Sequence, residues 1–236
     1  KRAVKMVRQA IRDKRLTMDR VDESVKKILT AKYWAGLNKK QPINEEQVFE
    51  DVNRSESMVL RQQIADASMT LLRGRDFIKT LSPSKRTVIL NVGTPDVTTF
   101  QKELALVYQN SVVYNLKKDA NADDIAKVLT EIKADDQVMI GIFDTRTRPG
   151  NNIPLSADLK MMLKDMANKN AVLALFANPY NLAGLPGLED AKALIVAYQK
   201  EDYMQKSAAS VLKNQLITTG KLPVTVNEFF KYGDGQ

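Results

Sequence analysis

The sequence predicts an α/β protein in which a mainly parallel sheet lies between two layers of helices. Short apolar runs of strand length alternate with amphipathic segments of helix length between residues 88 and 212. The run ALIVA at 193–197 is apolar throughout, as expected for a strand that is buried on both faces. These two patterns together are typical of a three-layer α/β sandwich.

Residues 1–37 are predicted to form two amphipathic helices. Thr17 is the expected N-cap of the second helix, and Gly36 is expected to end it. The apolar faces consist of Val4, Val7 and Ile11 in the first helix and Val21, Val25, Ile28 and Leu29 in the second. We expect these faces to dock on the α/β domain or on a second copy of the chain. Rapid proteolysis within residues 15–35, with the rest intact, would contradict this expectation.

Residues 38–53 show no sustained period and include Pro42, so they are predicted to be a linker. A helix is expected from about Arg54 to Leu72. Its inward side chains would be Leu60, Ile64, Ala67, Ser68 and Leu71. The predicted domains are therefore a helical segment at 1–37, a linker at 38–53 and an α/β domain at 54–236.

Strands and helices are expected to alternate through the α/β domain. Before the run at 193–197, the predicted strands lie at 88–92, 111–114, 138–143 and 171–176. The helices between them are marked by Phe100, Leu104, Val107; Ile125, Val128, Leu129, Ile132; and Leu159, Met162, Leu163, Met166. Apolar positions of the last helix are Met204, Ala208, Val211 and Leu212. Gly220 is expected to stop this helix, and 222–226 to form a short closing strand with Pro223 at its margin.

Composition limits the chemistry that the chain can perform. Cysteine and histidine are both absent, so thiol chemistry is excluded, and the commonest general base and metal ligand are missing. Catalysis would have to use carboxylates, lysine or tyrosine. No Gly-x-Gly-x-x-Gly or Walker loop occurs, and we expect neither a cofactor nor a metal. No apolar run approaches the ~20 residues of a membrane helix.

The net charge of +8 is concentrated near the N-terminus. Residues 1–40 hold 13 basic and 4 acidic side chains, a balance of +9, whereas the remainder holds 23 and 24, a balance of −1. We favour a solvated helical surface over a nucleic-acid-binding one. The alternative function is a stand-alone ligand-binding or regulatory α/β domain, with a basic helical arm that contacts nucleic acid or another protein. Salt-dependent affinity for DNA would support that alternative.

Candidate binding residues lie in the loops that follow the strands, because doubly wound sheets bind ligands beyond the carboxyl ends of their strands. The longest such loop, 144–152, contains Asp144, Arg146 and Arg148, whose planar donors suit a sugar or a carboxylate. A local pair of Asp144 with an arginine in a solvated loop is the alternative interpretation. Segments 178–180 and 199–202 are weaker candidates. The adjacent pairs Asp123-Asp124 and Asp135-Asp136 are better explained by capping and solubility than by metal binding.

Three segments resemble glycoside hydrolase family 3. A strand ending in Ala197-Tyr198, a helix rich in small residues and then GKLPVT at 220–225 are similar to the end of the second domain of that family. ADASMTLLR at 65–73 resembles the entry helix of this domain. LTMDRVDESV at 16–25, ILTAK at 28–32 and Gly36-Leu37 resemble the last helices of the (β/α)8-type barrel of the family. One departure is Asn214, which stands where the family often has glycine; asparagine also tolerates a left-handed backbone.

The resemblance implies that the chain is the C-terminal part of a longer parent protein. Residues 1–37 would be the last helices of a truncated barrel, and the partners would be the missing barrel domain and, through the parent, a carbohydrate. In β-glucosidase-like members the loop equivalent to 144–152 carries a glutamate acid/base. That loop has no glutamate here, which favours the β-N-acetylhexosaminidase branch. The nucleophile belongs to the barrel, so the chain itself is expected to be inactive. The compartment is left open, with a periplasmic or extracellular parent expected.

Overall fold

The computed structural model describes residues 2–39, 42–146, 150 and 152–236. The chain divides into two compact units, Lys1–Arg54 and Ser55–Gln236, and each is described by itself. In the described part of the chain, no helix combines the length and the apolar character needed to cross a membrane.

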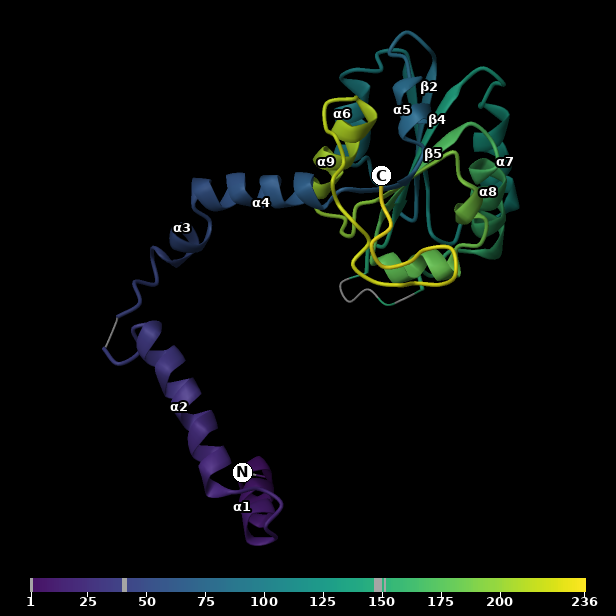
Figure 1. Cartoon of the computed structure of the whole chain (residues 1–236). Coiled ribbons are helices and arrows are strands. Elements are labelled where there is room, and N and C mark those ends of the chain that lie inside the picture. Colours follow the sequence, from purple (N-terminus) through teal and green to yellow (C-terminus); the bar gives the residue numbers. More distant parts are fainter. Residues whose placement is uncertain (1, 40–41, 147–149, 151) are drawn as a thin grey trace. The chain divides into compact units, whose positions relative to one another are not determined.

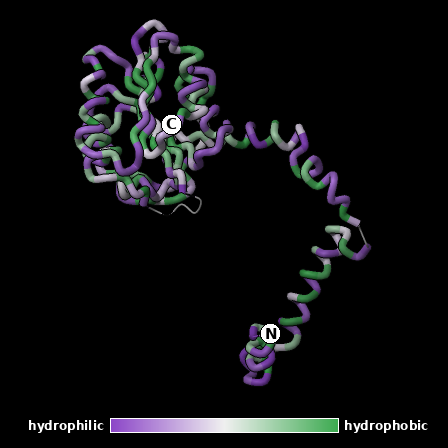
Figure 2. Tube along the Cα trace, turned by 180° about the vertical axis from the view of Figure 1, so that it is seen from behind, coloured by the Kyte–Doolittle hydropathy of each residue, from purple (hydrophilic) through white to green (hydrophobic). Residues whose placement is uncertain are grey.

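The first unit is helical. It contains α1 (Arg2–Arg12), α2 (Met18–Trp34) and a short α3 (Val48–Val52), which lies within the predicted linker. The Thr17 hydroxyl accepts a hydrogen bond from the Arg20 backbone N–H at 3.2 Å, so the predicted cap of α2 is confirmed. Gly36 follows the helix with a φ of 74°. Along α2, hydrophobic and hydrophilic residues alternate as in an amphipathic helix (Figure 2).

The apolar face of α2 is open to solvent in this structure. Val25, Ile28 and Leu29 are 45%, 55% and 58% exposed. No residue described in α1, α2 or α3 is buried. The docking expected for residues 1–37 stays a prediction, as does their origin in a barrel.

A six-stranded sheet organises the second unit. Its strand order is β1-β6-β5-β4-β2-β3, in which β1 pairs antiparallel with β6 and all other pairs are parallel. The strands are β1 (Thr70–Arg73), β2 (Thr87–Val92), β3 (Ser111–Leu116), β4 (Gln137–Phe143), β5 (Ala171–Phe176) and β6 (Ala193–Val196). Five of these correspond to runs that the sequence predicts to be strands.

Helices cover both faces of the sheet (Figure 1). One face packs on α7 (Ala122–Thr130) and α8 (Ala157–Ala167), and the other on α6 (Thr99–Ala105) and α9 (Asp202–Leu212). Alternate strand residues enter the two cores: Leu90 packs toward α7 and α8, whereas Ile89 packs toward α6 and α9. The predicted fold class, a mainly parallel three-layer α/β sandwich, is confirmed.

The helix predicted from Arg54 to Leu72 is partly wrong. Helix α4 covers only Ser55–Ser68, and Thr70–Arg73 forms the edge strand β1. The short helix α5 (Arg75–Lys79) follows. Leu60 and Ile64, predicted to point inward, are 55% and 60% exposed, because α4 buries Ala65 instead.

The end of the chain also differs from the prediction. Helix α9 ends at Leu212 rather than near Gly220, and Asn214 adopts the left-handed conformation at φ 57°. Residues 222–226 are not a strand. The Leu222 N–H instead donates to the Asp234 carbonyl at 2.7 Å, so this segment folds against the chain's own tail. Pro223 has no N–H to contribute to a sheet.

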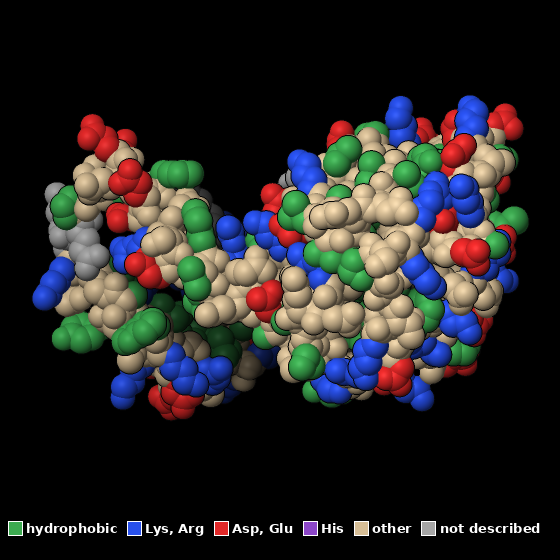
Figure 3. Space-filling model, turned by 90° about the horizontal axis from the view of Figure 1, so that it is seen from above, with side chains coloured by type: hydrophobic (Ala, Val, Ile, Leu, Met, Phe, Trp, Pro, Cys, Tyr) green, Lys and Arg blue, Asp and Glu red, His purple; other side chains and the backbone are tan. Residues whose placement is uncertain are grey.

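Charged side chains of both signs are interspersed on the face of the larger body seen in Figure 3. This mixture agrees with the near-neutral balance of residues 41–236. Of the acidic pairs in the sequence, Asp124 forms an ion pair with Lys127 at 3.8 Å in the first turn of α7. Asp136 is buried against Arg86.

Candidate functional site

The loops after β4, β5 and β6 meet around one pocket. These three strands are neighbours and run parallel, so their carboxyl ends lie at the same edge of the sheet. The pocket has a volume of ≈ 410 Å³. Its lining consists of Asp144, Arg146, Phe176, Ala177, Asn178, Tyr198, Gln199, Lys200 and Glu201. The 144–152 loop and both weaker candidate segments of the sequence thus contribute to one surface.

An aromatic cluster packs at the ends of the strands that carry the pocket loops. Phe143 and Phe176, at the ends of β4 and β5, stack with ring centroids 4.5 Å apart. Phe100 of α6 meets Phe176 edge-on at 5.1 Å. These rings are buried and pack specifically, so the strand ends that carry the loops are held in fixed positions.

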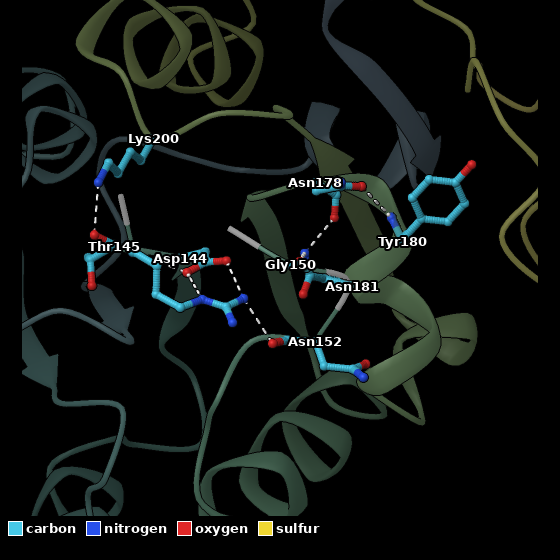
Figure 4. A network of polar contacts seen from close by, with 9 residues as sticks. Asp144, Thr145, Gly150, Asn152, Asn178, Tyr180, Asn181 and Lys200 are labelled. Carbon is cyan, nitrogen blue, oxygen red and sulfur yellow. Dashed lines mark hydrogen bonds and ion pairs between the residues drawn. The ribbon is translucent and has the colours of Figure 1, made fainter. Parts of the chain in front are cut away.

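Asp144 and Arg146 form a bidentate ion pair inside the first loop (Figure 4). Arg146 Nε donates to Asp144 Oδ1 at 2.8 Å and Nη2 to Oδ2 at 2.7 Å, and the Arg146 backbone N–H adds a third bond at 3.2 Å. Nη2 also donates to the Asn152 carbonyl at 2.9 Å. The Asp144 side chain is only 2% exposed, whereas that of Arg146 is 33% exposed.

Two opposing effects act on the Asp144 carboxyl. Burial raises its pKa, but the hydrogen bonds and the positive charge of Arg146, with a further contribution from Lys200, outweigh burial and lower it below the ordinary value of 3.8. Asp144 is therefore a carboxylate near neutral pH. This local pair is the alternative that the sequence left open. Arg148, the other candidate, lies outside the described residues.

The loop after β5 contacts the first loop at Gly150. Asn178 caps the 3-10 helix Pro179–Gly184, and its side chain accepts from the Tyr180 N–H at 3.0 Å. The buried Asn181 amide donates to the Asn178 carbonyl at 2.8 Å and to the Gly150 carbonyl at 3.3 Å. Within the described chain, its Oδ1 has no hydrogen-bond partner, and a water or a ligand hydroxyl could supply one.

The loop after β6 begins with a strained turn. Tyr198 has a φ of 62°, and the Gln199 N–H donates to the Ala197 carbonyl at 2.6 Å, which closes a γ-turn around Tyr198. Positive φ is rare for a bulky residue. The Tyr198 hydroxyl lies 2.6 Å from Thr70 Oγ1, and this contact anchors the ring. In the sequence, Tyr198 is recognisable only as the end of a strand, because local patterns do not reveal backbone strain.

Lys200 connects the third loop to the first. Its ammonium donates to the Thr145 carbonyl at 2.9 Å (Figure 4). Glu201, the N-cap residue of α9, is exposed, and its side chain forms no capping hydrogen bond. The charges of Asp144, Arg146, Lys200 and Glu201 cancel, so the pocket presents donors and acceptors without net charge. Such a surface suits a neutral hydroxylated ligand better than an ion.

Two carboxylates, Asp144 and Glu201, line the described part of the pocket. In the residues that the structure describes, no group of three carboxylates or other metal ligands comes together. Asp144 is engaged in its ion pair, which leaves Glu201 as the other carboxylate at the pocket. The described lining offers hydrogen-bond donors and acceptors to a polar ligand.

Comparison with known proteins identifies relatives of this fold. A glycoside hydrolase family 3 β-N-acetylglucosaminidase from Paenibacillus sp. str. FPU-7 has a TM-score of 0.58 and 19% identity, over 93% of this chain and 42% of its own. A β-glucosidase from Listeria innocua has a TM-score of 0.65 and 17% identity, over 94% of this chain and 34% of its own.

The search of curated sequences adds a weaker relative. A candidate β-xylosidase of Formosa agariphila is 24% identical over 87% of this chain and 31% of its own length. No protein-family profile matches the chain. The chain thus spans less than half the length of each of these relatives. In its fold, this chain corresponds to part of a glycoside hydrolase family 3 enzyme, as the sequence resemblance predicts.

Proposed function

We propose that this chain is the non-catalytic C-terminal portion of a family 3-like glycoside hydrolase, whose parent is a retaining β-N-acetylhexosaminidase. The chain supports the barrel domain of that parent and lends the 144–152 loop to the sugar site. One observation carries the proposal: three loops converge on a neutral polar pocket at the carboxyl edge of a sheet whose fold family 3 enzymes share. The partners are the barrel of the same protein and, through it, a carbohydrate.

The carboxylates of the pocket support a non-catalytic role. Retaining hydrolysis requires two carboxyls about 5–5.5 Å apart, one acting as nucleophile and one as acid/base. Asp144 is held ionised by Arg146, so it is a poor proton donor. Glu201, the other carboxylate in the described lining, cannot perform both roles. One of the two catalytic carboxyls without the other gives almost none of the rate enhancement.

The choice of branch rests on the sequence. Residues 144–152 lack the glutamate expected of a β-glucosidase-like member. The relatives with this fold include both a β-N-acetylglucosaminidase and a β-glucosidase, so the branch needs a direct test.

Activity measurements test the proposal. The 236-residue chain should release no chromophore from aryl β-N-acetylglucosaminide or aryl β-glucoside, whereas the longer protein should cleave the former faster. Turnover by the chain alone that survives repurification and is lost in the Glu201→Gln variant would overturn the proposal. A longer protein that prefers the aryl β-glucoside would contradict the branch but not the role of the domain.

A further inference from the structure

Two pockets of the second unit share a boundary at Tyr198 and Gln199. The first is the polar pocket at the ends of β4, β5 and β6. The second has a volume of ≈ 390 Å³ and is built mainly from α4 and the start of α9. Because both linings include Tyr198 and Gln199, the two pockets are adjacent.

The second pocket is mainly apolar. Leu60, Ile64, Ala65 and Met204 give it an aliphatic surface. Arg61 is the one charged residue among the described residues that line it, and its guanidinium lies 4.8 Å from the centre of the Tyr203 ring. In this cation–π contact, the positive charge of Arg61 interacts with the face of the Tyr203 ring. Leu60 and Ile64, whose apolar side chains are predicted to point inward, are thus exposed beside the polar pocket.

The shared boundary is the most constrained part of the groove. The γ-turn at Tyr198 places this residue and Gln199 in both linings, and the contact of its hydroxyl with Thr70 fixes the ring against the sheet. A non-glycine residue keeps a positive φ only where the surroundings enforce it, and such positions concentrate at ligand-binding sites. The Tyr203 hydroxyl donates to Oε1 of the Gln199 side chain at 3.0 Å. This hydrogen bond ties the turn to α9.

We propose that the two pockets form one groove for a β-glycoside with an apolar aglycone. The sugar hydroxyls bind in the polar pocket, where Asn178, Gln199, Lys200 and Glu201 offer both donors and acceptors. The aglycone lies against Leu60, Ile64 and Met204. This inference rests on the proposed function and adds the class of aglycone, because a neutral polar pocket next to an apolar one matches a ligand with a hydroxylated head and an apolar body.

Titration of the isotopically labelled chain tests the groove. The probes are methyl and phenyl 2-acetamido-2-deoxy-β-D-glucopyranoside, and phenol alone, followed in ¹H–¹⁵N NMR spectra. Both glycosides should shift the amides of Asn178, Gln199 and Lys200. The phenyl glycoside alone should also shift Ile64 and Met204, and it should bind about tenfold more tightly than the methyl glycoside, equivalent to about 1.4 kcal/mol.

Two matched variants of α4 distinguish specific binding in the groove from non-specific hydrophobic binding. Ile64→Ser removes an exposed β-branched side chain from the pocket, whereas Val59→Ser removes one of similar exposure, 58% against 60%, that is not among the lining residues. Ile64→Ser should abolish the preference for the phenyl glycoside and leave the methyl glycoside unchanged. Val59→Ser should change neither affinity, and thermal melts check that both variants fold.

The outcomes separate this inference from the proposed function. If neither glycoside shifts the polar pocket, the groove is overturned, whereas the proposed function, in which the barrel completes the sugar site, is decided by the activity measurements on the longer protein. If both glycosides bind equally and Ile64→Ser has no effect, the groove is refuted while the sugar site stands. If phenol binds at Ile64 as tightly as the phenyl glycoside does, the apolar pocket is independent of the sugar site, and the inference is overturned.

Discussion

Asp144 and Arg146 show how one buried carboxylate organises a loop that the sequence predicts to be exposed. The first residue after β4 turns its side chain inward, where it is 2% exposed, and Arg146 folds back to pair with it. The desolvation of the carboxylate is offset by charged hydrogen bonds. The guanidinium remains one-third exposed at the pocket, so it can still meet a ligand while it is paired with Asp144.

Replacement of Asp144 by asparagine tests this pair. Its lowered pKa means that its contribution to stability is present above the ordinary value of 3.8 and is lost as the pH falls through the lowered value. At pH 7 we expect Asp144→Asn to reduce the free energy of unfolding by about 1.5–3 kcal/mol. The difference from wild type should shrink well below pH 4, as urea unfolding at both pH values would show.

A matched surface carboxylate provides the control. Asp76 also has a lowered pKa, chiefly through its hydrogen bond to Lys79, but its side chain is 95% exposed. Solvent screens this pair, so Asp76→Asn should have little effect at either pH. Equal losses in the two variants would mean that burial of Asp144 is not what gives the pair its strength.

The arginines of the loop have distinct expected effects on the longer protein. If either one donates to the substrate, its replacement by alanine should lower kcat/KM roughly 10–150-fold, as expected for loss of a charged donor. Arg146→Ala also leaves Asp144 without its ion pair, so we expect a lower Tm in this variant. Combining Arg146→Ala with Asp144→Asn removes the unpaired charge. Wild-type kcat/KM in the double variant and in Arg148→Ala would show that the loop makes no substrate contact.

At the scale of elements, the end of β4 near the site lies in close backbone contact with the end of β2. Gly93 follows β2 with a φ of 97°, and a Cβ at this position would lie 2.3 Å from the Phe143 carbonyl oxygen at the end of β4. Glycine is required here by both the conformation and the contact. The neighbouring ends of β2 and β4, where the chain changes its direction of winding, can therefore lie close together.

Two glycine variants separate the contact from the conformation. Gly93→Ala should destabilise the chain by about 2 kcal/mol or more, because it adds a steric clash to the cost of positive φ. Gly233 has a similar φ of 88° but nothing within 4 Å of the added Cβ, so Gly233→Ala should cost only about 1 kcal/mol. Chemical denaturation of both variants measures the difference. Equal costs would show that the strand ends can move apart freely.

At the scale of the whole molecule, the core belongs to the second unit. Every apolar side chain in the two described cores comes from residues at or after Ala65. The first unit has no buried residue in its described helices, although it carries most of the net positive charge. The stability of the α/β domain can thus be explained from its own sequence.

We therefore expect residues 55–236 alone to unfold in a single cooperative transition. A circular-dichroism melt compared with that of the full chain provides the measurement. Since about 1 kcal/mol shifts the Tm of a domain of this size by about 2–4 °C, a difference beyond that range would reveal stabilisation by the first unit. A broad, non-cooperative melt of the fragment would contradict the expectation.

The sequence by itself determined the parallel strands, most helices and the edge of the sheet where the candidate site lies. Strands buried on both faces need continuous apolar runs, and the crossover helices need an apolar stripe, so both patterns are local. Loops at the carboxyl ends of such strands can be located without coordinates, so the sequence alone places 144–152, 178–180 and 199–202 at this edge.

Only the tertiary structure decided which local alternative each ambiguous segment adopts. Thr70–Arg73 is a strand because it pairs with β6, and its own sequence equally suits the end of a helix. Ile64 is exposed because α4 turns Ala65 toward the core. The inward turn of Asp144 and the strained turn at Tyr198 likewise depend on Arg146 and Thr70 being brought into contact with them. Such choices depend on partners that are distant in sequence or on how a loop folds back, and a linear pattern carries no information about either.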